Sequence, residues 1–520
     1  MSVDTAEHGS HAHDYDNDYY DDDSVVSLTG RGGTAPTTAL RFAPRSPDEV
    51  AAAVRGSGAR GAIARGLGRG CGDAAQNAGG SVLDMTGLDR IRALDANAGV
   101  VVCEAGVSLG RLTEVLLPLG WYPPVAPGSG RTTVGGAIAA DVHGGNHPAA
   151  GSFTRHVESL ELLTADGERR TVPPSTRLFD ATAGGLGLTG VILSATVRLR
   201  RVGTSLLRVD TERATDLDDL LARLTAATGT AGADSGTGTG TSGAAGSGTG
   251  AGASGAAGSG TGAGASGAAG SGTGAGRASG YTVAWVDLMA RGTALGRSVL
   301  LRGEHAPLSA LPPRARRRPL THRPARIAAD APAPVPPAGP VGRAAAALFN
   351  EVWYRTAPRA RTGELRHLPA FGRPPGGPVR RPGIYGRDGF VRYQFAVGYG
   401  QEEALRRIVE RVAHRGCPVF PAELTCFGAG GPGWLSFPTP GWTLAMELPV
   451  AGRSWLAPFL DELDEEVAAA GGRVCLAQDA RLRPEALAAM YPRLAEFRAL
   501  RAELDPRAAF TSDLSRRLSL

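Results

Sequence analysis

A stretch with almost no large side chains divides this chain and limits what the rest of it can fold into. Between about Ala226 and Gly280 the sequence is almost wholly Gly, Ala, Ser and Thr, and a twelve-residue unit starts at Ser242, Ser254 and Ser266. Such a segment cannot bury enough apolar surface to offset the entropy that ordering costs, so we expect a flexible, disordered insert. It is not a solenoid, because stacked repeats need an apolar face.

Two further segments are expected to be disordered. Residues 1–24 form an acidic tail rich in Asp, Tyr and His, without the basic and apolar regions of a signal peptide. Residues 306–341 form a second insert, rich in Pro and Arg. No stretch approaches the ~20 apolar residues of a membrane span. We therefore expect a cytoplasmic protein, and association with a membrane surface is left open.

The composition argues against nucleic-acid binding and against a metal site. The 520 residues carry a net charge of only +5, and the densest basic run, residues 314–318, has no interleaved aromatic side chains. The five cysteines are scattered, without Cys-x-x-Cys or zinc spacing, which fits a reducing compartment. The chain contains no lysine.

The periodicity of the remaining sequence predicts an α+β fold in two parts. Before the insert, strands are expected at residues 81–85, 99–106, 157–164 and 190–199, and helices at 47–55 (with Ser46 as N-cap) and 108–116. After it, strands are expected at residues 281–288, 391–397 and 442–449, and helices at 402–414 and 456–470. The first part has mixed short strands rather than a βαβ array, and the second is built around a sheet.

Two glycine-rich stretches are the strongest indication of a ligand. The first, RGLGRGCGD, covers residues 65–73, and the second extends over residues 127–147; each follows an apolar, strand-like run. Glycine lets backbone amides approach a ligand closely, and successive amides in such turns form a concave anion site that suits a diphosphate. Two such stretches in one half of the chain suggest a dinucleotide held from two sides.

Spacing alone does not identify the ligand. A P-loop requires a lysine, which this chain lacks. The dinucleotide pattern Gly-x-Gly-x-x-Gly can be read from Gly66 and Gly68, but it fails at Cys71. Tight turns in a glycine-rich protein are an equal alternative at this point.

Short segments over nearly the whole chain outside the tail and the inserts form a recognisable pattern. They are residues 28–30, 34–36, 63–69, 72–77, 133–139, 143–147, 150–153, 184–190, 353–355, 393–395, 436–442, 505–506 and 510–518. This pattern resembles the FAD-dependent oxidases of the vanillyl-alcohol oxidase type, and among them the oxidases of decaprenylphosphoryl-linked ribose.

The resemblance implies a two-subdomain, PCMH-type FAD-binding domain at residues 25–203 and an α+β substrate domain with an antiparallel sheet at residues 204–479. Residues 480–520 would return to the FAD domain. The cofactor would be FAD, bound non-covalently, with its diphosphate on the two glycine stretches. The matched cofactor-binding residues are Arg65, Gly66, Leu67, Gly68, Arg69, Gly70, Cys71, Asn77, Pro127, Gly128, Thr133, Gly135, Gly136, Ala139, His143, Gly144, Asn146, Gly190 and Ile192.

The implied reaction is oxidation of a secondary hydroxyl of a sugar or polyol by hydride transfer to flavin N5, while a general base takes the hydroxyl proton. The catalytic candidates are His143, Arg392, Gln394 and Gln478. In these relatives the substrate is lipid-phosphate-linked, a short-chain reductase is the partner, and the product serves cell-wall arabinan biosynthesis.

The sequence departs from the family on the substrate side. Gln478 and Thr425 replace two lysines, and Arg392 replaces a neutral amide. Because a protonated lysine would polarise the substrate oxygen, we expect Arg392 to supply the lost positive charge. Ala445 replaces the cysteine that covalent inhibitors exploit, and Cys475 replaces a tyrosine.

Cys71 stands where close relatives have a tyrosine and where covalent members of the superfamily carry a flavin-linking histidine. A bond from Cys71 to the flavin is one interpretation, and a small residue lining the cofactor pocket is the favoured one. Two rival functions also stay open. They are an aldonolactone or alditol oxidase that uses O2, and a flavin-binding protein with impaired turnover because the lysines are missing.

Overall fold

The computed structural model describes residues 23–125, 130–228, 280–322, 342–371, 385–386, 388–420 and 422–520. Nearly all of the tail, the repeat insert and residues 323–341 lie outside this part of the chain. The start of the Pro/Arg-rich stretch lies inside it and contains α7 (Pro313–Arg316), whose Arg316 donates to the carbonyl oxygen of the buried Leu311. The expected repeat insert begins later than Ala226, since α6 extends to Thr228.

The N-terminal half contains two sheets. The first has the order β1-β2-β4-β3, with β1 and β2 antiparallel and both β2 and β3 parallel to β4. Its elements are β1 (Asp23–Leu28), β2 (Thr37–Phe42), β3 (Ala62–Arg65), β4 (Ser81–Asp84) and α1 (Pro47–Gly56). Helix α1 begins where expected, because the Ser46 hydroxyl accepts a hydrogen bond from the Glu49 amide at 3.2 Å.

The second sheet is antiparallel and has the order β5-β6-β10-β8-β9. Its strands are β5 (Ile91–Asp95), β6 (Val100–Glu104), β8 (Val157–Leu163), β9 (Arg169–Val172) and β10 (Val191–Arg198). Apolar side chains from α2 (Leu109–Leu116), α3 (Val134–Ala139) and α5 (Arg177–Thr182) complete its core. The short strands β7 (Trp121–Tyr122) and β11 (Arg200–Arg201) pair beside it.

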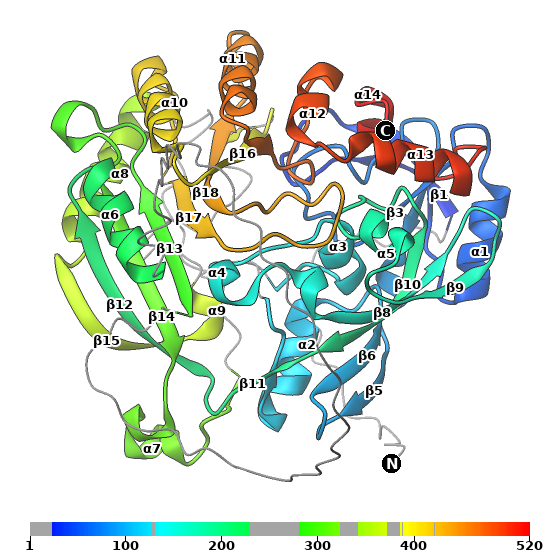
Figure 1. Ribbon diagram of the computed structural model, residues 1–520, viewed down its shortest axis with the longest axis horizontal. Helices are drawn as coiled ribbons and strands as arrows, with labels where there is room; N and C mark the ends of the chain where they lie inside the picture. Colours follow the sequence, from blue (N-terminus) through cyan, green and yellow to red (C-terminus); the bar gives the residue numbers. More distant parts are fainter. Residues whose placement is uncertain are drawn as a thin grey trace, which may run out of the picture.

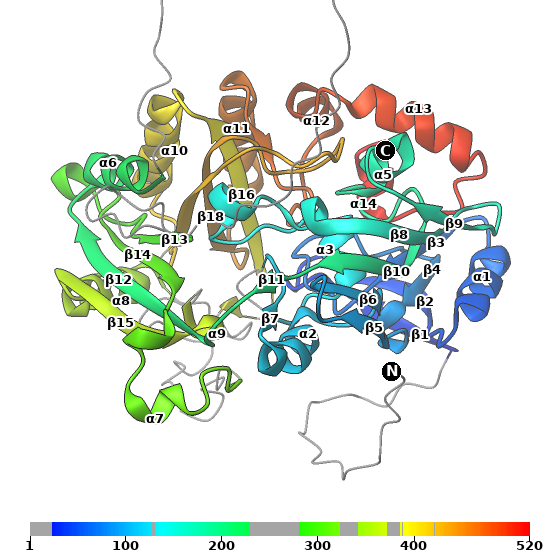
Figure 2. The same ribbon diagram turned by 60° about the horizontal axis from the view of Figure 1, so that its bottom comes forward.

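The second half is built on one antiparallel sheet of eight strands in the order β15-β12-β14-β13-β17-β18-β16-β19 (Figures 1 and 2). The strands are β12 (Leu206–Ala214), β13 (Tyr281–Val286), β14 (Ser298–His305), β15 (Ala360–His367), β16 (Phe390–Gly398), β17 (Ala422–Phe427), β18 (Gly441–Pro449) and β19 (Arg473–Val474). This sheet confirms the expected α+β class with an antiparallel sheet in the second half.

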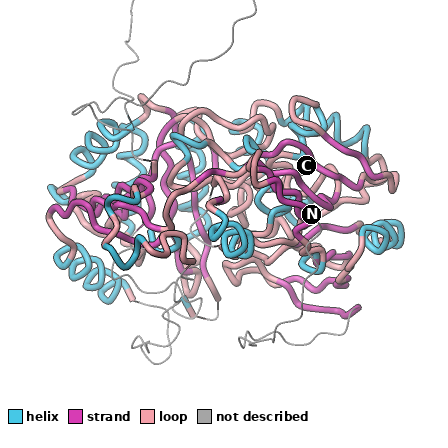
Figure 3. The backbone as a smooth tube through the Cα atoms, turned by 90° about the horizontal axis from the view of Figure 1, so that it is seen from below, coloured by secondary structure: helices cyan, strands magenta, loops and turns pink. Residues whose placement is uncertain are grey.

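Helices lie on both sides of these strands (Figure 3). On one side, α6 (Leu217–Thr228), α10 (Glu402–Arg415) and α11 (Leu456–Ala469) bury apolar side chains in the largest core cluster. On the other side, α8 (Arg343–Thr356) and α9 (Leu368–Phe371) cover the β12–β14 end only, with Trp353 and Phe371 in the contact. Alternate residues of a strand share a face. At the β16–β18 end, the apolar residues face the first side, so the second side includes polar residues.

The C-terminal segment runs back over the N-terminal half (Figure 1). It contains α12 (Pro484–Met490), α13 (Leu494–Leu504) and α14 (Asp513–Arg517). The Ala62 amide donates to the Ala509 carbonyl at 2.7 Å, and the Thr511 amide donates to the Ala62 carbonyl at 2.9 Å. The chain around Phe510 therefore extends the first sheet at its β3 edge. None of the helices in the described ranges is long and apolar enough to cross a bilayer.

A buried carboxylate joins the two halves. Asp141 accepts hydrogen bonds from the Ser152 hydroxyl (2.8 Å), from the Thr154 amide (3.1 Å) and hydroxyl (2.5 Å), and from the Ser436 hydroxyl of the second half. Burial raises the pKa of Asp141, while these donors favour its ionised form. The loop between β17 and β18 is thus fastened to the N-terminal half through one side chain.

Replacing Asp141 with alanine should destabilise the protein by about 3 kcal/mol or more, because several buried donors would lose their acceptor. Thermal unfolding of Asp141→Ala measures this loss. Asp95→Ala is the matched control, since Asp95 is exposed and its carboxylate accepts from the local amides of Asn97 and Ala98. Equal unfolding temperatures for the two variants would contradict the role given to Asp141.

Candidate active site

The two glycine-rich stretches lie against each other. The first leaves the end of β3, and a Cβ on Gly66 would come within 3.0 Å of the Thr133 hydroxyl. The same loop touches the second half of the molecule, since a Cβ on Gly70 or on Gly72 would come within 3.0 Å of the carbonyl oxygens of Ala477 and Asp479. At Gly70 and Gly72 a larger residue would require the backbone to move, and at Gly66 it would displace the Thr133 side chain.

The first stretch has the properties of an anion cradle. Among the residues that the structure describes, none accepts a hydrogen bond from the backbone amides of residues 67–71. Gly68 has φ +59°, in the left-handed region, which turns the chain within this run of amides. Successive unpaired amides in such a turn suit a phosphate group. The loop therefore fits the diphosphate of the expected cofactor.

In the second stretch, the amides at the start of α3 are already paired. At the start of α3 the amides of Val134 and Gly135 donate to the carbonyls of Val107 and Ala105, both at 2.8 Å, and the Gly136 amide donates to the Thr133 hydroxyl. These three donors are satisfied inside the protein. Two predicted cofactor residues, Pro127 and Gly128, lie outside the described residues.

The two arginines of the first stretch have different roles. Arg65 donates to the carbonyls of Thr29 (2.7 Å) and Ala75 (3.1 Å), so it stabilises the loop through contacts with neighbouring backbone. Arg69 has a buried Nε without an acceptor among the described residues. Burial, and then the neighbouring charges of Arg31 and Arg131, lower the pKa of Arg69 to about 10. An anion would relieve this repulsion, which makes Arg69 the cationic partner for a phosphate.

The structure also places the other predicted cofactor residues. The Asn77 amide nitrogen donates to the carbonyls of Gly61 (2.9 Å) and Ser81 (3.3 Å), which shapes the start of β3 and β4. Ile192 belongs to the core of the second sheet, and a Cβ on Gly190 would collide with the Leu163 carbonyl. The remaining members of the set are placed as follows: Leu67 is exposed, Ala139 accepts from the Leu186 amide, Gly144 accepts from the His147 amide, and the Asn146 side chain donates to the Pro124 carbonyl.

His143 and Gln394 meet between the two halves. The Gln394 amide nitrogen lies 2.9 Å from His143 Nε2, and with Gln394 as donor the imidazole carries its proton on Nδ1. Nδ1 is buried and has no acceptor among the described residues. Burial, and then His147 and Arg392, lower the pKa of His143 to about 3. The ring is therefore neutral, and it packs edge-on to Phe427 at a centroid distance of 4.8 Å.

Arg392 shares the face of β16 with Gln394, but its charge is compensated. It forms ion pairs with Glu447 of β18 (3.2 Å) and Glu423 of β17 (3.6 Å). Although burial alone would lower the pKa of Arg392, these two carboxylates raise it. Glu447 also accepts from Arg31 (3.4 Å) and from the Tyr385 hydroxyl (2.8 Å). Arg392 therefore lies in a balanced network rather than offering an isolated positive charge.

Gln478 lies on a segment that touches both the first glycine stretch and β16. Its neighbours Ala477 and Asp479 approach Gly70 and Gly72, as described above, and the Cys475 amide donates to the Gln394 carbonyl at 2.9 Å. The Gln478 side-chain oxygen is buried without a donor among the described residues. Thr425 is different, because its hydroxyl donates to the Thr282 carbonyl at 3.0 Å.

Sequence reasoning missed the partners of Arg392. Glu423 and Glu447 come from strands whose order in the sheet no local pattern predicts. Arg31 and Tyr385, which donate to Glu447, come from segments outside the strands. The available signal was a carboxylate inside each of two otherwise apolar strands, since a buried charge requires a partner. Among the described residues no group of three or more His, Cys, Asp or Glu side chains is suited to a metal ion.

Comparisons with known proteins agree with this geometry. A family model described as an FAD binding domain matches residues 38–173, which include the first glycine stretch and the described part of the second. An uncharacterized protein in the mprA 5' region of Streptomyces coelicolor is 48% identical over 424 residues, covering 80% of this chain and all of that protein.

Decaprenylphosphoryl-beta-D-ribose oxidase of Mycolicibacterium smegmatis is 36% identical over 504 residues, covering 95% of this chain and 97% of that protein. D-lactate dehydrogenase of Archaeoglobus fulgidus is 32% identical over 178 residues, covering 32% of this chain and 40% of that protein. Together with the cradle, these matches establish FAD as the cofactor.

FAD should be bound without a covalent bond to Cys71. The thiol is buried, and burial raises its pKa, so the reactive thiolate is disfavoured. Precipitating the purified protein with acid should leave the yellow colour in the supernatant, both for the unchanged chain and for Cys71→Ala. Colour that stays in the pellet of the first and leaves the pellet of the second would show a covalent link.

The neutral state of His143 should make stability depend on pH. The pKa of His143 is lower in the folded protein than the ~6.5 of an unfolded chain, so the unfolded chain takes up a proton first as the pH falls. The stability that the neutral ring contributes is therefore fully present above pH 6.5 and is lost as the pH falls below it. Between pH 7 and pH 5 the protein should lose up to about 2 kcal/mol more unfolding free energy than His143→Gln. Denaturant titrations at both pH values measure the difference, and parallel losses would contradict it.

Proposed function

Since the chain belongs to the family of FAD-dependent oxidoreductases that includes decaprenylphosphoryl-β-D-ribose oxidase, we propose that it oxidises a secondary hydroxyl of a sugar or polyol. The observation that carries the proposal is the contact between the neutral His143 and Gln394, on the face of β16 turned toward the N-terminal half. When bound, the flavin accepts a hydride from the carbinol carbon.

The residues around this contact suit an uncharged, hydroxyl-rich substrate. Gln394 and Gln478 carry amides, which donate to and accept from hydroxyl groups without adding charge. Within the described ranges, the buried oxygen of Gln478 and Nδ1 of His143 have no hydrogen-bond partner. A substrate hydroxyl that takes over the Gln394 amide frees His143 Nε2 to accept the hydroxyl proton. His143 is then the general base and the two glutamines orient the sugar.

The relative's name provides the finer part of the proposal. Its substrate is ribose linked to decaprenyl phosphate, and the same class of substrate is proposed here, with a short-chain reductase as the partner that reduces the keto product. Such a pair of reactions would invert one carbon of the sugar, as cell-wall arabinan biosynthesis requires. An aldonolactone or alditol is the alternative substrate, with O2 as the oxidant.

One observation favours a second candidate function, a flavin-binding protein with impaired turnover. The positive charge of Arg392 is not a free replacement for that of the missing lysines, since Glu447 and Glu423 compensate it. Gln478 and Thr425 carry no charge. Among the described residues, the substrate face thus has no uncompensated cation to stabilise developing negative charge, and this absence would slow hydride transfer.

Anaerobic mixing with candidate substrates tests these functions. Loss of the visible flavin absorption with a polyprenyl-phosphate-linked pentose supports the proposal, and loss with an aldonolactone or alditol, followed by peroxide on admitting air, supports the alternative.

Gln394→Leu should slow flavin reduction by about 100-fold, since an orienting hydrogen bond is removed. Gln401→Leu, an exposed glutamine, is the matched control. Failure of every substrate to reduce the flavin would leave the second candidate function.

A further inference from the structure

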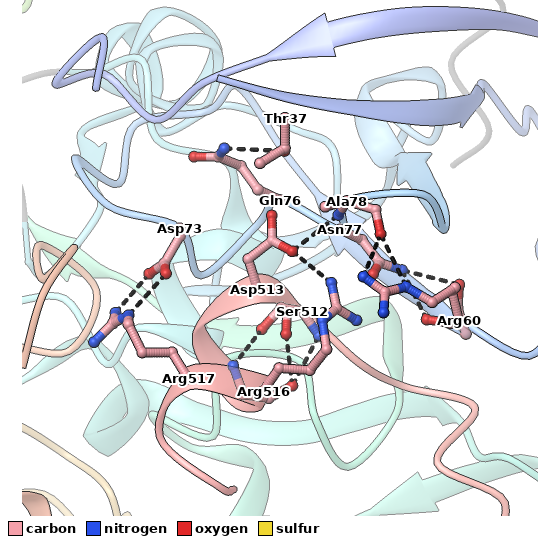
Figure 4. A network of polar contacts seen from close by, with 12 residues as sticks. Thr37, Arg60, Asp73, Gln76, Asn77, Ala78, Ser512, Asp513, Arg516 and Arg517 are labelled. Atoms are coloured by element: carbon pink, nitrogen blue, oxygen red, sulfur yellow. Dashed lines mark hydrogen bonds and ion pairs between the residues drawn. The ribbon is translucent and has the colours of Figure 1, made fainter. Parts of the chain in front are cut away.

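Arg517, three residues from the end of the chain, lies between two carboxylates from distant parts of the sequence. Its Nε and Nη2 donate to the Asp73 carboxylate at 3.0 and 2.7 Å, and its Nη1 lies 3.0 Å from Asp479 Oδ2 (Figure 4 shows the pair with Asp73). Nη1 also donates to the Leu482 carbonyl at 2.7 Å. The planar guanidinium thus uses all three of its nitrogens.

The two carboxylates belong to the two sides of the active site. Asp73 ends the first glycine stretch, directly after Gly72. Asp479 follows Gln478, and its carbonyl is the group that a Cβ on Gly72 would meet. Arg517 therefore fastens the anion cradle to the segment that carries a substrate-facing glutamine.

Helix α14, which carries Arg517, is itself held against the residues that follow the first stretch. The Asp513 amide donates to the Gln76 carbonyl at 2.8 Å, and Asp513 Oδ1 accepts from the Ala78 amide at 2.9 Å (Figure 4). Ser512 caps the helix through a reciprocal pair of bonds with Ser515. Helix α14 thus gives Arg517 a fixed position relative to the loop.

We infer that Arg517 is a positioning residue for the cofactor, which sets the shape of the first glycine stretch and its distance from Gln478. This inference rests on the assignment of that stretch as the diphosphate cradle. Without the guanidinium, the half-buried Asp73 and the buried Asp479 would be two neighbouring carboxylates without their shared cation. Their repulsion would separate the loop from the Gln478 segment and change the arrangement of the amides of residues 67–71.

The loss should therefore appear in the binding of the phosphate part of the cofactor. Arg517→Met should raise the Kd for FAD by about tenfold or more, while the Kd for riboflavin, which has no phosphate, stays unchanged. Arg517→Lys should recover part of the loss, because its ammonium restores the positive charge but not the planar two-point contact with Asp73. A merely structural role would lower the unfolding temperature and leave the ratio of the two Kd values as it is.

Flavin fluorescence with the full chain, after removal and readdition of the flavin, measures both Kd values. Arg516→Met is the matched control, since the neighbouring Arg516 pairs with Asp513 of its own helix. Asp73→Asn serves if Arg517→Met does not fold, because the isosteric amide breaks the ion pair with little change of shape. An unchanged ratio of Kd values in whichever of Arg517→Met and Asp73→Asn folds would overturn the inference.

One further variant separates this inference from the assignment of the cradle. Gly68→Ala strains the left-handed turn inside the loop itself. If Gly68→Ala weakens FAD binding and Arg517→Met does not, the cradle is correct and the role of Arg517 is wrong. If neither variant changes FAD binding, both the cradle and the role of Arg517 are wrong.

Discussion

The close approach of the first glycine stretch to its surroundings is the constraint on which the site depends. On one side Gly66 faces Thr133, and on the other Gly72 faces the Asp479 carbonyl, in both cases with no space for a Cβ. These two contacts bring the cofactor cradle, the start of α3 and the Gln478 segment into one place. Space requires glycine at these two positions, and backbone conformation favours it at Gly68 between them, so the loop acts as a surface on which both halves of the molecule meet.

Charge is distributed unevenly over this meeting surface. At the cradle, Arg69 has no compensating partner for its buried Nε among the described residues, which favours an anion. On the face of β16 that carries Gln394, the charge of Arg392 is compensated by Glu447 and Glu423, and the neighbouring His143 is neutral. The site therefore combines a cationic end for a diphosphate with an uncharged, hydrogen-bonding end for hydroxyl groups. That arrangement accounts for FAD binding more directly than for rapid hydride transfer, because in the described part of the chain no isolated cation replaces the missing lysines.

Local elements of the fold could be predicted from the sequence, and the pairing of those elements could not. Ser46 predicts the start of α1, the apolar run at residues 157–164 predicts β8, and the helical periodicity of residues 402–414 predicts α10. These predictions succeed because capping and periodicity act over a few residues. The contact of Arg392 with Glu447 depends on the order β17-β18-β16, which only the whole sheet decides. The amides of Val134 and Gly135 looked available in the sequence, but Val107 and Ala105 accept from them once β6 is in place.

The most distant of these pairings also has a consequence for how the site is completed. Asp73 and Arg517 are separated by 444 residues, and the chain around Phe510 extends the first sheet at β3. Closing a loop of that length costs entropy that only the final contacts return. The N-terminal half contains every amide of the cradle, yet the conformation of the cradle depends on the last residues of the chain. The cofactor site is therefore a property of the complete fold rather than of the FAD-binding half alone.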